Sequence, residues 1–252
     1  MINWPAGVDR IAFDSIDSTN KEAARRAAQT TTPLWILAGV QTAGVGRRGR
    51  AWSSQQGNFA ATYLMPIAGD LSNVALHSFV ASLALRDAFV HAMGQPERFR
   101  LKWPNDVLMD GGKLAGILLE TCGVGPSHLC VGIGVNLAIA PEVAKIEHNS
   151  TAPQHLDGQI TPSDFLTLLA HFFSIRVDQF NTHGFTATRA DWLKDAAKLG
   201  EIITARMPHT EITGKFVTVD EGGGVVLQAG SDQHVIHAAD IFFEETSNAA
   251  GH

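Results

Sequence analysis

Residues 41–52, Q-T-A-G-V-G-R-R-G-R-A-W, combine residue types that could bind a phosphate group. Glycines let backbone N–H groups approach an anion closely, and arginines supply planar charged donors that match phosphate oxygens. The segment is neither a Walker loop nor a dinucleotide-binding turn, because those motifs lead into a helix and these glycines lead back into an expected strand. We interpret it as a flexible phosphate loop, with a solvated basic surface loop as the alternative. The residues concerned are Gly44, Gly46, Gly49, Arg47, Arg48 and Arg50.

A second set of polar residues begins in K-W-P-N-D, residues 102–106, and continues into G-G-K-L-A-G-I-L-L-E, residues 111–120. Two lysines, one carboxylate and one amide lie close together in this part of the sequence. Such a set could polarise a carboxylate group and hold a triphosphate with magnesium. The alternative for W-P-N-D is an Asx turn, because Pro-Asn-Asp is a common turn composition. The residues concerned are Lys102, Asn105, Asp106 and Lys113.

The side chains of a strand alternate between its two faces, which predicts how the residues after Lys113 are arranged. Lys113 and Ala115 should share one face, and Gly116 should lie on the other. The missing side chain of Gly116 would leave room for a ligand on that face.

Two weaker signals lie elsewhere in the chain. G-I-G-V-N, residues 132–136, ends an apolar run at the amide of Asn136. D-S-T-N, residues 17–20, precedes an expected helix in which Thr19 and Glu22 have the spacing of a capping box. A helix N-terminus presents hydroxyls and free N–H groups to a polar ligand, so cap and binding site can coincide.

Composition restricts the class of protein. The chain has 252 residues, of which 45% are hydrophobic, enough for one sizeable core and a small appended domain. Charged residues make up 17% and the formal net charge is -6, so the chain as a whole has no electrostatic reason to bind nucleic acid or an anionic membrane. The sequence shows no signal peptide and no apolar run of membrane-spanning length, and we expect a cytoplasmic protein.

Cysteines and histidines indicate neither a redox pair nor a metal site. Cys122 and Cys130 lie in apolar sequence without C-x-x-C spacing, and we expect two buried, inert thiols. The histidines form no ligand spacing, and we expect surface positions for His148 and His155. Only Asp106 is a candidate metal contact, through magnesium.

Hydrophobic period and turn residues predict a mixed α/β (α+β) chain. Capping residues precede apolar faces near residues 19 and 161, and helices are also predicted over 73–93 and 186–198. Apolar runs separated by turn signals predict a largely antiparallel or mixed sheet with strands over residues 10–15, 34–41, 58–65, 98–103, 107–109, 113–121 and 129–136.

The composition changes close to Leu199. Beyond it, short β-type runs at 201–206, 212–219, 225–228 and 235–238 are joined by glycine-rich turns. This stretch can hold five short strands, enough for a small β-barrel that packs on the larger domain. We predict two domains, residues 1–199 and 200–252.

Taken in order, D-S-T-N, Q-T-A-G-V-G-R-R-G-R-A-W, K-W-P-N-D, K-L-A-G-I-L and G-I-G-V-N resemble the biotin protein ligase family. The resemblance is close over residues 13–137 and looser beyond. It implies a class II synthetase-like catalytic domain with a central mixed sheet flanked by helices, and an SH3-like C-terminal barrel. It also implies the reaction: biotin and ATP give biotinyl-AMP and pyrophosphate, and the biotinyl group then passes to a lysine of a biotin carboxyl carrier domain, for example of acetyl-CoA carboxylase.

The resemblance also implies roles for individual residues. Lys113 would be catalytic together with Arg47, because a cation can draw the biotin carboxylate toward the α-phosphate and offset the charge that develops as pyrophosphate leaves. The residues that would bind biotin are Ser18, Thr19, Asn20, Gln41, Gly44, Gly46, Arg47, Lys113 and Gly116. Those that would bind ATP and the adenylate are Arg48, Arg50, Trp52, Lys102, Asn105, Asp106 and Asn136.

The chain departs from the family pattern in two respects. Many members have an arginine where this chain has Val45, so we expect its loop to hold the intermediate differently. Some members carry an N-terminal winged helix that binds DNA, whereas only twelve residues precede Phe13 here. We therefore expect a monofunctional ligase that uses ATP, biotin and Mg²⁺, acts as a monomer or homodimer, and has neither nucleic acid nor membrane as a partner.

Two other functions are compatible with parts of this pattern. A lipoate or octanoate ligase of the same superfamily would use similar adenylation. Gln41 and the D-S-T-N residues argue against it, because buried polar groups left unpaired by an apolar chain cost about 1–3 kcal/mol each. A non-catalytic biotin-binding module would retain the pocket and release no pyrophosphate.

Overall fold

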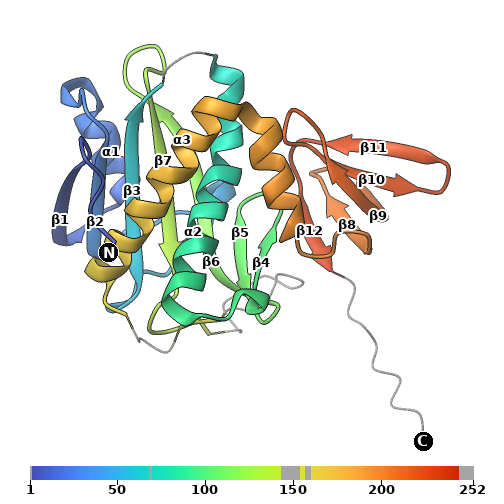
Figure 1. Cartoon of the computed structure of the whole chain (residues 1–252), viewed down its shortest axis with the longest axis horizontal. Coiled ribbons are helices and arrows are strands. Elements are labelled where there is room, and N and C mark those ends of the chain that lie inside the picture. Colours follow the sequence, from blue (N-terminus) through green and yellow to red (C-terminus); the bar gives the residue numbers. More distant parts are fainter. Residues whose placement is uncertain (1, 68–69, 143–153, 157–159, 244–252) are drawn as a thin grey trace, which may run out of the picture.

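A seven-stranded mixed sheet forms the centre of the computed structural model, which describes residues 2–67, 70–142, 154–156 and 160–243. The strand order is β1-β2-β3-β7-β6-β5-β4, with β1 parallel to β2 and every other neighbouring pair antiparallel (Figure 1). The predicted mixed sheet is therefore confirmed. Its strands are β1 (Asp9–Ile16), β2 (Leu34–Gln41), β3 (Phe59–Pro66), β4 (Phe99–Lys102), β5 (Asp106–Met109), β6 (Gly112–Cys122) and β7 (His128–Val135).

Helices cover both faces of this sheet. The long helices α2 (His77–Met93) and α3 (Pro162–Lys194) lie side by side on one face, and α1 (Thr19–Arg26) packs on the other (Figure 1). Alternation along β2 explains this arrangement: Trp35 belongs to the core beneath α2 and α3, and Ile36 belongs to the core beneath α1. No helix in the described part of the chain is long and apolar enough to cross a membrane.

Two helix boundaries differ from the sequence prediction. A 3-10 helix, Leu71–Leu76, occupies the first part of the predicted helix over residues 73–93, and the α-helix begins only at His77. The two helices predicted after residue 161 are joined into α3, with a break at Gly184, where φ is 69° and ψ is -172°. Only glycine adopts that conformation readily, so the predicted division into two helical segments is confirmed, although the second ends at Lys194.

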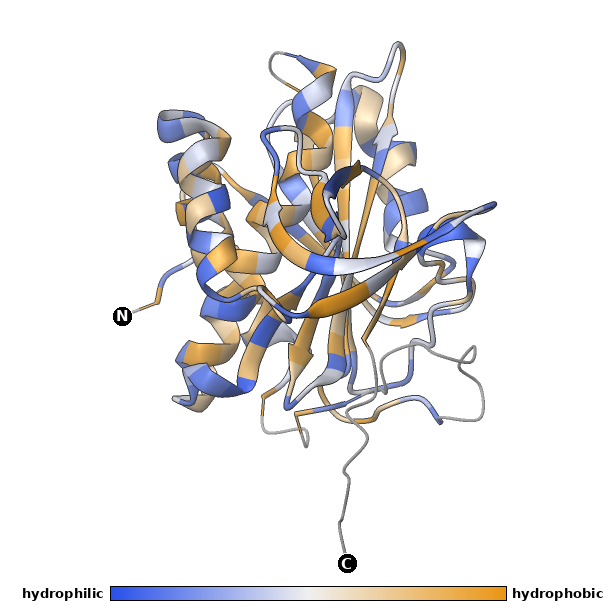
Figure 2. Cartoon of the chain, turned by 90° about the vertical axis from the view of Figure 1, so that its right-hand side faces the viewer, coloured by the Kyte–Doolittle hydropathy of each residue, from blue (hydrophilic) through white to orange (hydrophobic). Residues whose placement is uncertain are grey.

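Five strands after residue 200 form a second, antiparallel sheet, called here the C-terminal sheet. Its order is β11-β10-β9-β8-β12, and Figure 2, which faces it, shows hydrophobic and hydrophilic residues alternating along the strands. Trp103 Nε1 donates a buried 2.8 Å hydrogen bond to the carbonyl of Gly223 and so ties the two sheets together. The strands are β8 (Ile202–Arg206), β9 (Glu211–Val219), β10 (Val225–Ala229), β11 (Asp232–Ile236) and β12 (Asp240–Phe243).

Candidate functional site

A cavity of about 800 Å³ lies where the Gly/Arg loop, the K-W-P-N-D turn, strands β6 and β7, and the C-terminal sheet meet. Segments far apart in sequence supply its lining, and all but two of the predicted site residues contribute to it, the exceptions being Gly44 and Gly49. The residues that contribute are Ser18, Thr19, Asn20, Gln41, Gly46, Arg47, Arg48, Arg50, Trp52, Lys102, Asn105, Asp106, Lys113, Gly116 and Asn136.

Gly44 is one of the two predicted site residues that do not line the cavity. It is buried beneath the loop, where its carbonyl accepts a 2.9 Å hydrogen bond from Trp52 N. A Cβ at this position would lie 2.9 Å from Gln41 Nε2 and 3.0 Å from the carbonyl oxygen of Trp52. Glycine is therefore required here for packing of the loop against Gln41.

One end of the cavity is lined by uncharged polar side chains that belong to a hydrogen-bond network. Gln41 Oε1 accepts from both the backbone N and the hydroxyl of Thr19, at 2.8 and 3.0 Å. The hydroxyl of Thr62 lies 2.8 Å from Thr19 Oγ1 and 2.6 Å from Asn20 Oδ1. Asn20 Nδ2 in turn donates to Glu120 Oε2 at 2.6 Å. The orientations of the Thr19 and Asn20 side chains are thus fixed by the protein itself.

The predicted capping box at Thr19 is wrong. Ser18 is the N-cap of α1: its backbone is extended, and its hydroxyl accepts from Lys21 N at 3.5 Å. Thr19 is the first helical residue, and its hydroxyl is directed to Gln41 instead of the helix backbone. The helix start still presents polar groups to the cavity, as the sequence predicts.

The Gly/Arg loop is a closed turn. An antiparallel bridge joins Val45 to Ala51, and Gly46 N donates to the carbonyl of Arg50 at 2.7 Å. Arg47–Gly49 between them forms a 3-10 turn in which Arg48 has a positive φ of 56°. A non-glycine residue in this region stores local strain, which is typical of functional loops.

The three arginines of this loop converge on one carboxylate of the C-terminal sheet. Arg48 Nη1 lies 2.7 Å from Asp240 Oδ2, and Arg50 Nη2 lies 3.1 Å from Asp240 Oδ1. Arg47 Nη1 is 3.9 Å from Asp240 Oδ1 and donates to Asn105 Oδ1 at 3.2 Å. Burial lowers the pKa of Arg47, and the charge of Asp240 opposes that shift. Three cations are thus held together, partly desolvated, at the second end of the cavity.

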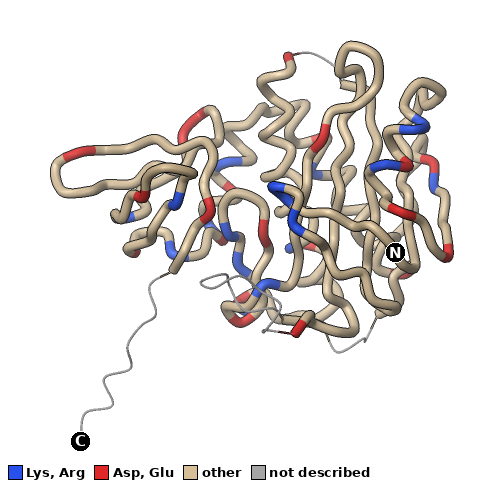
Figure 3. Tube along the Cα trace, turned by 180° about the vertical axis from the view of Figure 1, so that it is seen from behind, with Lys and Arg blue, Asp and Glu red and all other residues tan. Residues whose placement is uncertain are grey.

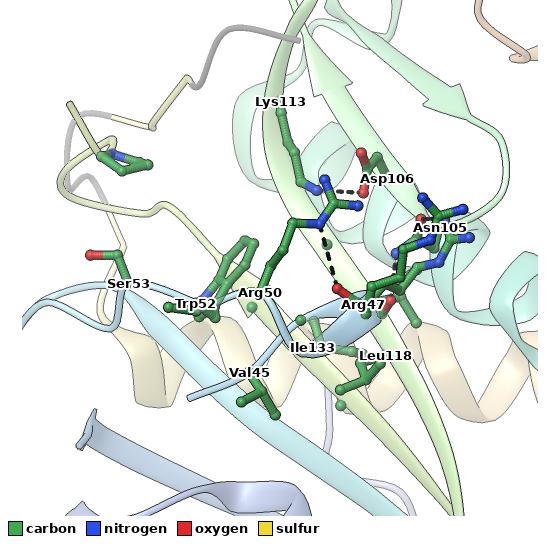
Figure 4. Close-up of a pocket in the computed structure, with 18 of the residues that line it drawn as sticks. Val45, Arg47, Arg50, Trp52, Ser53, Asn105, Asp106, Lys113, Leu118 and Ile133 are labelled. Carbon is green, nitrogen blue, oxygen red and sulfur yellow. Dashed lines mark hydrogen bonds and ion pairs between the residues drawn. The ribbon is translucent and has the colours of Figure 1, made fainter. Parts of the chain in front are cut away.

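Two lysines extend this cationic end. Lys113 Nζ forms a 2.7 Å ion pair with Asp106 Oδ1 and lies 5.7 Å from the centre of the Trp52 ring. Lys102 is 7% exposed, and its ammonium lies 4.7 Å from the ring centre of Phe243. Burial lowers the pKa of Lys102 to about 8, although the charge of Asp106 raises it. Figure 4 shows Arg47, Arg50 and Lys113 directed toward the same space.

The prediction that Lys113 and Gly116 lie on opposite faces of β6 is wrong. Leu108 pairs with Lys113 and Val107 pairs with Ala115, so one residue of β6 is extra at this point and forms a bulge. A bulge changes which face the following side chains occupy. Lys113 and Gly116 consequently share the cavity, and a Cβ on Gly116 would lie 3.4 Å from Lys113 Nζ.

The space left by Gly116 is filled by Trp52. Gly116 pairs with Gly134 across β6 and β7, and the indole of Trp52 lies against both. A Cβ on Gly134 would be 2.3 Å from Trp52 Cε2, and one on Gly116 would be 3.2 Å from Trp52 Cζ3. The absence of side chains at Gly116 and Gly134 therefore allows the Trp52 indole to pack against the sheet and form one wall of the cavity. Asn136 also lines the cavity, with its amide donating to the carbonyl of Gln154 at 3.0 Å.

Several residues that line the cavity or support its lining carry no signal in the sequence. Thr62 lies within a strand, and the cavity residues from the C-terminal sheet lie in a part of the sequence that contains no binding motif. Their place in the site depends on the tertiary fold, which no local pattern encodes. Those from the C-terminal sheet are Arg206, Asp240, Ile241 and Phe242.

The cysteines are closer together than the sequence indicates. Cys130 is buried, as predicted, and burial raises the pKa of its thiol. Cys122 is only half-buried, because it lies near the end of β6, and its Sγ is 3.1 Å from Cys130 Sγ. His155 is half-buried, and His148 lies outside the described residues.

Charges of both signs are interspersed along the described trace (Figure 3). The cationic character of the cavity is therefore local and arises from the convergence of the Gly/Arg loop, Lys102 and Lys113. A neutral polar end and a cationic end in one cavity suit a ligand that is itself polar at one end and anionic at the other.

Fold and site together define a ligase of the Biotin/lipoate A/B protein ligase family, whose model matches residues 12–136. The model described as Biotin protein ligase C terminal domain matches residues 198–244. A Biotin--[acetyl-CoA-carboxylase] ligase of Paracoccus denitrificans is 45% identical over 233 residues, covering 90% of this chain and 97% of that protein. The chain belongs to the biotin protein ligase family.

Other relatives agree with this assignment. A Bifunctional ligase/repressor BirA of Bacillus subtilis is 29% identical and covers 93% of this chain, and 74% of that protein is matched. The solved biotin protein ligase of Aquifex aeolicus in complex with biotin and ATP superposes with a TM-score of 0.78 at 26% identity. That match covers 92% of this chain and 97% of the Aquifex chain.

Proposed function

We propose that this protein activates biotin with ATP to give biotinyl-5′-AMP and pyrophosphate, and then transfers the biotinyl group to a specific lysine of a biotin carboxyl carrier protein or domain. The observation that carries the proposal is the cavity with a neutral polar network at one end and a cationic cluster at the other. The relative from Paracoccus denitrificans is named for the same reaction, and the Aquifex aeolicus structure contains the same two small substrates.

The polar end is suited to the fused ureido ring of biotin. A ureido group has one carbonyl acceptor and two N–H donors, and Ser18, Thr19, Asn20 and Gln41 offer both kinds of partner at the cavity wall. Because the Thr19 to Asn20 network is already hydrogen-bonded within the protein, these groups are oriented before the ligand arrives. Preorganised polar groups lose little entropy on binding and discriminate against apolar chains.

The cationic end is suited to the activation step. A biotin carboxylate oxygen attacks the α-phosphorus of ATP, a new O–P bond forms, and the bond to the pyrophosphate oxygen breaks. Lys113 and Arg47 would bring the two anionic reactants together and offset negative charge on the phosphoryl oxygens as pyrophosphate leaves. Arg48, Arg50 and Lys102 line the same end, where they would hold the phosphates.

In the transfer step, the neutral amine of the carrier lysine attacks the acyl carbon of biotinyl-AMP. An amide bond forms, AMP leaves with the electrons of the acyl–phosphate bond, and the amine releases a proton. Acyl-adenylates react readily with water, so the closed Gly/Arg loop would protect the intermediate until the carrier arrives. The indole of Trp52, seated on Gly116 and Gly134, would form the wall behind it.

Magnesium would enter the site with ATP. The carboxylates that line the cavity are Asp106, Glu142 and Asp240, and the described residues contain no cluster of three or more metal-ligating acidic, histidine or cysteine side chains. One carboxylate with substrate phosphates is a common way to hold Mg²⁺, and Asp106 fits that role. The ion would neutralise phosphate charge beside the arginines.

We also propose a domain boundary between residues 199 and 200. Ala197 N donates to the carbonyl of Leu101 at 2.7 Å and so belongs to the edge of the large sheet. Gly200 N donates to the carbonyl of Phe216 at 2.8 Å and so belongs to the C-terminal sheet. Residues 1–199 would carry the catalytic machinery and residues 200–252 would complete the phosphate end.

A cytoplasmic monomer or homodimer without nucleic acid or membrane partners stays our prediction.

The experiment that tests this function is exchange of labelled pyrophosphate into ATP, with biotin, lipoate and octanoate as parallel substrates. Exchange with biotin alone would support the proposal, and transfer of label from biotin to a carrier domain would complete it. Exchange with lipoate or octanoate in preference to biotin would reassign the substrate. Tight biotin binding without exchange would indicate a non-catalytic module.

A further inference from the structure

We propose that Asp240 is a positioning residue, which assembles the three arginines of the Gly/Arg loop before ATP binds and holds the loop over the cavity. The proposal rests on the function proposed above, because it assigns the arginines to the phosphates of ATP. It gives the C-terminal sheet a specific task in a reaction whose other predicted residues all lie within residues 18–136.

Geometry supports this task. Asp240 is the only described residue whose carboxylate lies within 4 Å of all three guanidinium groups, and its side chain is 22% exposed. Its backbone is fixed, because Asp240 begins β12 and pairs with Arg206 of β8. The neighbouring carbonyl of Ala239 accepts a further 3.3 Å hydrogen bond from Arg47 Nη2. The loop therefore docks on a rigid strand end.

The backbone contacts of the loop do not fix the arginines in this way. The bridge from Val45 to Ala51 and the bond from Gly46 N to Arg50 O close the backbone of the turn on itself and involve no guanidinium group. Within the large domain, Arg47 Nη1 donates to Asn105 Oδ1 at 3.2 Å, and Arg50 Nε donates to the carbonyl of Arg47 at 3.5 Å. Three cations within four residues repel one another, and a shared carboxylate offsets this repulsion.

Before nucleotide binds, Asp240 thus supplies the negative charge beside the arginines that phosphate oxygens supply afterwards. An arginine cluster already gathered around one anion needs less ordering when a triphosphate arrives. The same contacts keep the loop closed, which excludes water from the acyl-adenylate. Removal of the charge should therefore weaken ATP binding and retention of the intermediate together, without disturbing the polar end where Thr19 and Gln41 lie.

Two variants and one control separate this role from a purely structural one. Asp240→Asn removes the charge and keeps the shape, and Asp240→Glu restores the charge. Glu201→Gln removes another carboxylate next to the C-terminal sheet, one that is paired with Lys198 at 2.8 Å and does not line the cavity. The readouts are the KM for ATP and for biotin in pyrophosphate exchange, release of biotinyl-AMP, and tryptic cleavage after the loop arginines without nucleotide.

For Asp240→Asn we expect a KM for ATP raised about tenfold, faster release of the intermediate, faster cleavage in the loop, and a KM for biotin within about twofold of the parent. Asp240→Glu should recover most of the ATP affinity, and Glu201→Gln should match the parent. An unchanged or lower KM for ATP in Asp240→Asn, or equal losses for ATP and biotin, would overturn the proposal. Tryptic cleavage needs no activity, so it tests the docking even if the parent shows no exchange and the proposed function fails.

Discussion

Lys113 Nζ and Asp106 Oδ1 lie 2.7 Å apart, across the hairpin of β5 and β6, because a bulge in β6 turns Lys113 into the cavity. The pairing orients the lysine without neutralising the cluster, since three arginines and Lys102 share the cavity. The ion pair with Asp106 therefore fixes the Lys113 ammonium at the wall of the cationic end of the cavity.

Removal of the Lys113 ammonium should abolish most of the activation step. For Lys113→Ala we expect adenylate formation to fall by about 10²–10³-fold, as on loss of other preorganised charge stabilisation, while the fold persists. Pyrophosphate exchange measures the first quantity, and thermal unfolding followed by circular dichroism measures the second. Near-normal exchange would exclude Lys113 from the mechanism, and Lys194→Ala, which alters an exposed ion pair, serves as the control.

Loss of the Arg47 side chain should impair retention of biotinyl-AMP more than its formation. Arg47→Gly loses the contacts to Asn105 and Ala239 that join the loop to the rest of the site, so we expect the loop to open more often in this variant. Release of biotinyl-AMP should then rise by a larger factor than exchange falls. A trapping assay for free biotinyl-AMP measures its release, and single-turnover kinetics measure its formation. If formation falls by a larger factor than release rises, this role for Arg47 is excluded.

Thr62 should be needed for biotin affinity although it does not line the cavity. Thr62→Val keeps the volume of this fully buried side chain and removes the hydroxyl that lies between Thr19 and Asn20. An unsatisfied buried polar group costs about 1–3 kcal/mol, so we expect biotin to bind about 5- to 100-fold more weakly. Calorimetric titration with biotin measures this, with Thr204→Val on the exposed face of β8 as the matched control. An unchanged affinity would mean that the network does not orient the binding groups.

ATP binding should weaken as the pH rises through 8. Burial lowers the pKa of Lys102 from 10.5 to about 8, against the raising effects of Asp106 and Asp240, so its cation is lost in that range. An unfolded chain would keep the proton up to about 10.5, so between these values the folded state binds fewer protons and this group makes the protein more stable as pH rises. A rise in the KM for ATP above pH 8 would therefore not reflect unfolding caused by Lys102.

The pH profile of Lys102→Arg provides the comparison for this prediction. An arginine keeps its charge throughout the range, so its KM for ATP should stay flat where that of the parent rises. Parallel profiles would assign the pH dependence to another group.

Much of the fold follows from local pattern, and the strands show why. The apolar run over residues 34–41 predicted the bounds of β2 correctly, and it is continuous because Trp35 and Ile36 face different cores. The bulge in β6 was not predictable, since nothing in K-L-A-G-I-L distinguishes a regular strand from one with an extra residue. Thr19 likewise has the residue type of a helix cap, and only its tertiary contact with Gln41 shows another use.

The site was predictable where its residues form contiguous motifs, which bring Arg47, Asn105 and Lys113 into one cavity. The roles given to these residues stay predictions. Asp240 could not be found in this way, because its proximity to the loop depends on how two sheets pack. Gly116 was assigned correctly to the cavity for an incomplete reason, since its missing side chain accommodates Trp52.

The separation of Asp240 from the loop it holds has a consequence for synthesis of the protein. A ribosome makes the Gly/Arg loop early and adds β12 almost 200 residues later. Until that strand emerges and pairs with β8, a nascent chain can fold its large sheet and still lack the anchor for its arginines. In such a folding intermediate the Gly/Arg loop would stay undocked, so ATP affinity and retention of the acyl-adenylate would mature only after the two sheets have packed together.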